Sequence, residues 1–129
     1  MMMTTAIAPQ MLDKARRVVD AHRESVQHAF EAGVRIAMGT DAGVGDHGDN
    51  LEELALYAAL GMDLEQVLAS TTSVAADLVA PEWRVGRVQE GWTADLLLLD
   101  TDLTSVDQLA TLKDHIAAVY LGGRRVAGA

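Results

Sequence analysis

The residues best suited to chemistry lie in one glycine-rich, acidic segment, residues 39–50, which holds four Gly and three Asp. Asp41 is the first acid after an apolar run, and Gly39 and Gly43 on either side allow a sharp turn and the close approach of a ligand. A carboxylate in this position can bind a metal ion and take a proton from a metal-bound water. An alternative role is to accept hydrogen bonds from loop amides, and the local spacing leaves both roles open.

Other polar residues of the same segment could assist. His47 could contact a substrate or stabilise a developing oxyanion, or it could face solvent. Asp41, Asp46 and Asp49 could form a weak site for a hard cation, although three loop carboxylates are more often solvated. These residues are the candidates for binding; Asp41 is the candidate for catalysis.

The remaining histidines are interpreted as structural. His22 and His28 are six residues apart, so they do not share a helix face as metal ligands three or four residues apart would. His115 lies far along the chain from Asp41 and precedes an expected strand.

The elements before the loop predict an α/β arrangement. Apolar residues recur at three- and four-residue steps from Pro9 to Glu31, which predicts one amphipathic helix that ends near Gly33. Val34 to Met38 is a short apolar run and predicts a buried parallel strand. Functional residues of α/β proteins gather beyond the carboxyl ends of such strands, and residues 39–50 follow this one directly.

The rest of the chain is expected to be helical up to Pro81 and β-rich after it. Asn50 with Glu53, and Asp63 with Gln66, have the spacing of capping boxes that open helices; a break is expected near residues 71–73. Strands are predicted at 83–88, 94–99, 116–121 and 124–127, the last after a Gly-Gly turn, with a helical turn at 107–113. The predicted organisation is a flexible N-terminus at 1–8, an α/β part at 9–80 and a small β-sandwich-type segment at 81–129.

Composition excludes several functions. Half of the 129 residues are hydrophobic, which is enough for a core. Without Cys there is no disulfide or thiolate metal site. A formal net charge of -9 argues against nucleic-acid binding. No run is long enough to span a membrane and no secretion signal is visible, so we expect a cytoplasmic protein.

Two sequence motifs resemble the amidohydrolase superfamily. Residues 39–43 (GTDAG), His47-Gly48 and residues 50–54 (NLEEL) are similar to the end of its barrel, with the imidazolonepropionase and Xaa-Pro dipeptidase-like branch nearest. Residues 85–100 (VGRVQEGWTADLLLLD) resemble the segment by which that family's chain returns to its small β domain, and residues 119–126 its closing hairpin. Their order along nearly the whole chain makes the pair more specific than either motif alone.

The resemblance implies a fold and a site. The chain would be α/β: the last strand and helices of a (β/α)8 TIM barrel, followed by a small β unit, with the barrel incomplete. Asp41 corresponds to the acid after the eighth strand, and so to a metal ligand and catalytic base. The metal implied is divalent, with zinc the first candidate. The family's His-x-His pair, its Lys or Glu and its single His ligands have no counterpart in this sequence.

These residues favour a carboxy-terminal segment of a metal-dependent hydrolase of C–N bonds, acting on small amides or dipeptides. We expect the isolated chain to be inactive and to associate with itself or with the missing part of the barrel, because a barrel of about 250 residues cannot close from one strand. A non-catalytic remnant that serves as an interaction module, and a small acidic cation-binding domain, are the alternatives.

Overall fold

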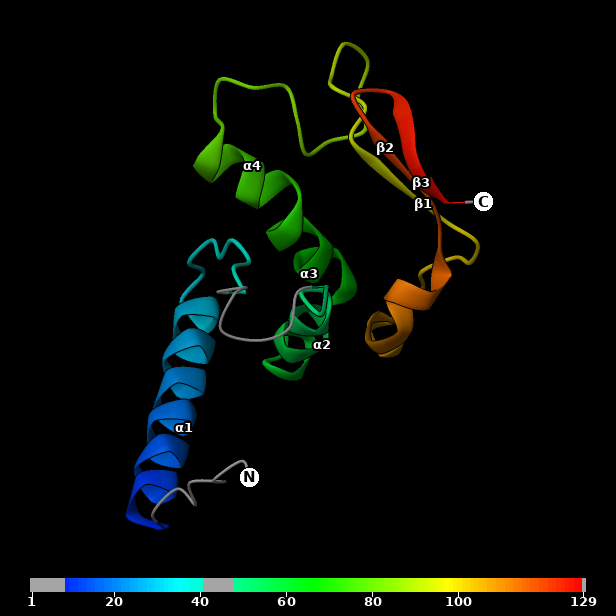
Figure 1. Ribbon diagram of the computed structural model, residues 1–129. Helices are drawn as coiled ribbons and strands as arrows, with labels where there is room; N and C mark the ends of the chain where they lie inside the picture. Colours follow the sequence, from blue (N-terminus) through cyan, green and yellow to red (C-terminus); the bar gives the residue numbers. More distant parts are fainter. Residues whose placement is uncertain (1–8, 41–47, 129) are drawn as a thin grey trace, which may run out of the picture. The chain divides into compact units, whose positions relative to one another are not determined.

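The computed structural model describes residues 9–40 and 48–128 (Figure 1). The chain divides into two units, Met1–Val34 and Arg35–Ala129. No helix in the described ranges is both long enough and apolar enough to cross a membrane.

The first unit is one helix, α1 (Pro9–Glu31), with the predicted bounds. Pro9 suits the first helical position, where its missing N–H costs nothing. Gly33 ends the helix with a φ of +77°, and its N–H donates to the Phe30 carbonyl at 2.8 Å. Apolar side chains such as Val18 remain exposed along it, and the described part of this unit contains no second element to cover them.

The second unit begins with three short helices, α2 (Glu52–Ala59), α3 (Leu64–Thr71) and α4 (Ser73–Val79). The Asp63 carboxylate accepts from the Gln66 N–H at 2.8 Å, and the Gln66 amide oxygen accepts from the Asp63 N–H at 2.9 Å. This confirms the predicted capping box, and the break predicted at residues 71–73 is present at Thr72.

A 3₁₀ helix and one antiparallel sheet complete the second unit. The helix is η1 (Val106–His115), and the strands are β1 (Leu96–Leu99), β2 (Ile116–Leu121) and β3 (Arg124–Gly128), in the order β1-β2-β3 (Figure 1). Gly122 and Gly123 have φ angles of +57° and +77°, the left-handed pair that a tight hairpin needs. The predicted closing hairpin is therefore confirmed. The described part of residues 81–129 holds this one sheet, so the sandwich-type arrangement stays a prediction.

The core of the second unit lies where α2 meets α3 and η1. Leu54 and Tyr57 of α2, Val67 of α3 and Leu109 of η1 are all buried there. Because Leu109 lies more than 40 residues after the other three in sequence, its burial with them packs η1 against α2.

Three local predictions were wrong. Residues 34–38 and 83–88 form no strand, because a strand needs a hydrogen-bonded neighbour and neither segment has one in the described chain. Asn50 does not cap α2: Leu51 takes the N-cap position and makes no side-chain cap bond. The helix instead begins on acids in its first turn, Glu52 and Glu53, which favour its positive end.

Candidate functional site

The two residues predicted to carry the chemistry, Asp41 and His47, lie outside the described residues. Asp46, the second member of the predicted acidic trio, lies there too. What the structure shows is how the backbone enters this loop at Gly39 and Thr40 and how it leaves at Gly48 and Asp49.

The entry to the loop is attached to α3. The Met38 N–H donates to the Ser70 carbonyl at 3.0 Å. Ser70 is itself 2% exposed, and its hydroxyl donates to the Val67 carbonyl at 2.7 Å. Residue 38 is therefore held against a buried position at the end of α3, three residues before Asp41.

A buried tyrosine on α2, Tyr57, contacts the backbone at the entry to the loop, at Gly39. Burial of Tyr57 raises the pKa of its hydroxyl, the Glu53 carboxylate raises this pKa further, and the backbone amide of Gly39 opposes both effects. The phenol is consequently neutral at ordinary pH, and it is placed beside the backbone that leads to Asp41.

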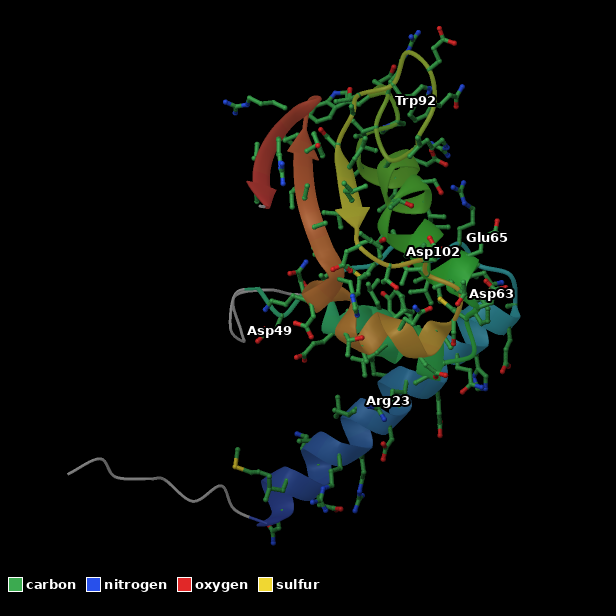
Figure 2. All side chains as sticks on the ribbon, turned by 90° about the vertical axis from the view of Figure 1, so that its right-hand side faces the viewer. Arg23, Asp49, Asp63, Glu65, Trp92 and Asp102 are labelled. Carbon is green, nitrogen blue, oxygen red and sulfur yellow. The ribbon has the colours of Figure 1, made fainter. Side chains whose placement is uncertain are left out.

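The exit from the loop is attached to η1. The Lys113 ammonium donates to the Asp49 carboxylate at 3.4 Å, and Asp49 lies beside η1 in Figure 2. Both side chains are more than half exposed, so the pair contributes little stability. The Lys113 ammonium nevertheless pairs with Asp49, which is the one acid of the trio within the described residues.

A charged cluster that the sequence did not reveal ties three segments together. Arg35, just before the loop entry, donates to the Asp77 carboxylate of α4 at 2.6 Å. Arg87 donates to both oxygens of the same carboxylate, each at 2.9 Å. The two arginines lower the pKa of Asp77 to about 2, with the hydrogen bond from Arg87 the largest cause. Asp77 is thus ionised across the physiological range.

The Arg87 end of the cluster is fixed in turn. Its guanidinium lies 5.1 Å from the ring centre of Trp92, within the range of a cation–π contact, and Trp92 sits in the loop before β1 (Figure 2). Gly86, with φ +81°, brings this segment so close to α4 that an added Cβ would lie 2.6 Å from the Ala76 Cβ and 2.7 Å from the Thr72 carbonyl.

The described histidines do not form a metal centre. His115 pairs through Nδ1 with the Asp100 carboxylate at 2.9 Å, in keeping with the structural role expected of it. Within residues 9–40 and 48–128 no three His, Asp or Glu side chains gather closely enough to hold a metal ion. A catalytic zinc needs about three protein ligands. The described residues do not supply that set.

Comparison with known families decides the relationship. Residues 1–126 match the amidohydrolase family. This chain belongs to the amidohydrolase family. The family is generally metal-dependent, and membership confirms the relationship that the two sequence motifs indicated.

Individual relatives agree with this assignment. Imidazolonepropionase of Rubrobacter xylanophilus is 33% identical over 97 residues, which are 73% of this chain and 23% of the relative. Ochratoxinase of Aspergillus niger is 27% identical over 117 residues, 89% of this chain and 24% of the enzyme. The chain spans about a quarter of the length of these relatives.

Solved structures give the same result. The crystal structure of A. niger ochratoxinase superposes with a TM-score of 0.80 at 27% identity, covering 96% of this chain and 28% of that one. A prolidase in complex with N-methylphosphonate-L-proline gives 0.76 at 26% identity, over 96% and 30% of the two chains. The predicted fold class, the last part of a TIM-barrel amidohydrolase followed by a small β unit, is confirmed by these neighbours.

Proposed function

We propose that this chain is the carboxy-terminal segment of a metal-dependent hydrolase of C–N bonds. The observation that carries the proposal is the family match over residues 1–126, which includes the GTDAG segment around Asp41. The anchored backbone at Met38 supports it, because a catalytic carboxylate needs a fixed point of attachment.

Asp41 is the proposed metal ligand and general base, and His47 the proposed substrate contact. When bound, a divalent ion, with zinc the first candidate, supplies a water whose pKa is lowered toward neutrality. Asp41 would hold the ion and act as the general base through its carboxylate, and His47 would donate a hydrogen bond to the substrate oxygen on which charge develops.

The proposed substrates are small amides or dipeptides. Relatives named imidazolonepropionase and prolidase act in this range of chemistry, and the loop acids are suited to hold a cation rather than an anionic polymer. We further propose a cytoplasmic location, and residues 9–80 and 81–129 as the barrel portion and the β portion of the chain.

The isolated chain is proposed to be inactive. Asp41 would be one ligand where a catalytic zinc takes about three, and a carboxylate without its partners loses both the activated water and the electrostatic stabilisation. The remaining ligands would come from the missing barrel portion, through association with it.

A second candidate is a non-catalytic remnant that serves as an interaction module, including self-association as a homo-oligomer. It is favoured by large apolar side chains that lie open around the end of α4 and in the segment after it: Leu78, Val79, Trp83 and Val88 are 70%, 77%, 70% and 89% exposed. Surfaces of this kind mark sites of protein association.

One experiment separates the two candidates. The reading frame upstream of the Met1 codon is sequenced, its product is expressed joined to this chain, and hydrolysis of a dipeptide panel is measured with added zinc. Zinc-dependent hydrolysis that Asp41→Asn abolishes supports the hydrolase. A folded, zinc-free and inactive product that still self-associates supports the interaction module.

A further inference from the structure

One charged cluster joins separate parts of the second unit. Asp77 on α4 accepts from Arg35 at 2.6 Å and from Arg87 at 2.9 Å. Arg35 and Asp77 are 42 residues apart in sequence, so this contact is tertiary and does not follow from local helix geometry. Two cations converge on one carboxylate, which can satisfy both because it has two oxygens and about four acceptor sites.

The partner segments differ in how they are held. Arg87 follows Gly86, which lies directly on α4, and its guanidinium also faces Trp92. Arg35 begins an irregular segment, residues 35–40, that belongs to no helix or strand. Its backbone is held at Met38 through the Ser70 carbonyl and at Gly39 through the Tyr57 hydroxyl. The Arg35 ion pair with Asp77 is a third attachment, at the start of the segment.

We propose that Asp77 is a positioning residue: through Arg35 it fixes residues 35–40, the segment that leads into the loop of Asp41. Arg87 holds the Asp77 carboxylate in the orientation that Arg35 requires. The role as a positioning residue for catalysis rests on the proposed function of Asp41; the attachment of residues 35–40 by Asp77 does not.

The geometry supports this direction of action. Arg87 contacts both Asp77 oxygens, whereas Arg35 contacts one, so a two-point contact orients the carboxylate and a one-point contact attaches the segment. The Asp77 side chain is 37% exposed and the Arg35 side chain 65% exposed. The pair is therefore accessible to substitution without opening the core.

Amide hydrogen exchange of the whole 129-residue chain tests the proposal. The Met38 amide reports on residues 35–40, because its hydrogen bond to Ser70 breaks when the segment detaches. The Val67 amide, bonded to the Asp63 carbonyl at 3.0 Å in the core, reports on the stability of the fold. The ratio of the two exchange rates separates local detachment from global loss of stability.

Asp77→Asn is expected to raise the Met38-to-Val67 ratio about three- to fivefold, the upper range for a partly exposed ion pair. Arg35→Gln should raise it equally, and the double variant should add nothing further. The matched control is Asp13→Asn, which breaks an Arg17 pair of the same 2.6 Å length on α1 and should leave the ratio unchanged.

An unchanged ratio in both Asp77→Asn and Arg35→Gln, or additive effects in the double variant, would overturn the proposal. If Asp77→Asn speeds exchange at Met38 and at Val67 by the same factor, the ratio is unchanged, the residue acts only through global stability, and the positioning role is wrong. None of these outcomes depends on hydrolysis, so the attachment can hold even where the proposed activity fails.

Discussion

Replacing Gly86 by alanine tests how closely the segment after α4 is packed. Gly86 has a φ of +81°, and a left-handed conformation costs an L-residue about 1–2 kcal/mol. The added methyl would also lie 2.7 Å from the Thr72 carbonyl and 2.6 Å from the Ala76 Cβ. Neither atom is the end of a flexible side chain, so overpacking adds about 1–3 kcal/mol.

The sum predicts that Gly86→Ala lowers the free energy of unfolding by about 2–5 kcal/mol. The assay is urea unfolding followed by circular dichroism, where the midpoint should fall by about 0.7 M or more, since a domain of this size has an m-value of about 1–3 kcal/mol/M. The matched control is Gly91→Ala. Gly91 has a φ of +78°, but the nearest atom to its added Cβ is the Arg84 guanidinium at 3.7 Å.

Gly91→Ala therefore keeps the backbone term alone, about 1–2 kcal/mol. The difference between the two variants measures the close approach to α4. Equal losses in the two variants would refute the reasoning, because they would mean that the segment moves away from Thr72 at no cost.

Three further predictions concern the core, the cap and the ion pair. Leu109→Ala should lower the free energy of unfolding in urea by about 2–5 kcal/mol, since Leu109 is 1% exposed. Its control is Leu78→Ala, at a site 70% exposed, which should change this free energy by about 0.5 kcal/mol or less. Asp63→Ala should cost about 0.5–2 kcal/mol through the lost capping box, and Asn50→Ala, which removes no cap bond, should be near neutral in the same assay. Asp77 has a folded pKa of about 2 against an ordinary 3.8, so the stability that its ionised carboxylate contributes is present above about pH 4 and is lost as the pH falls toward 2. The urea midpoints of wild type and Asp77→Asn should therefore differ at pH 6 and converge near pH 2. A difference that stays constant with pH would contradict the role of the ionised Asp77 carboxylate.

Helices were predictable from the sequence because their signals are local. The spacing of apolar residues predicted both ends of α1. The capping box that opens α3 was predictable because Asp63 and Gln66 lie in the same first turn of the helix. Strands depend on partners elsewhere: residues 34–38 are apolar enough for a strand, yet they have no ladder in the described chain. β2 and β3 were predictable because the Gly-Gly turn places their partner next in sequence.

The candidate site was predictable in part. Family motifs indicated the loop and its catalytic acid, and the family match bears out the relationship, while the roles of Asp41 and His47 stay predictions. The Arg35–Asp77–Arg87 cluster was missed because charge pairs 42 residues apart leave no periodic pattern. The sequence offered one usable signal, Gly86 beside Arg87, because a glycine permits a close backbone approach of the kind that the structure shows here.

Asp41 is proposed to be a metal ligand of a hydrolase that this chain completes. The most direct measurement is the zinc content and dipeptide hydrolysis of the chain joined to the product of its upstream reading frame, compared with the Asp41→Asn form. We predict zinc-dependent hydrolysis in the parent, and loss of hydrolysis by at least about a hundredfold in the variant, in line with the removal of a general base. Equal turnover and equal zinc content in the two proteins would contradict the claim.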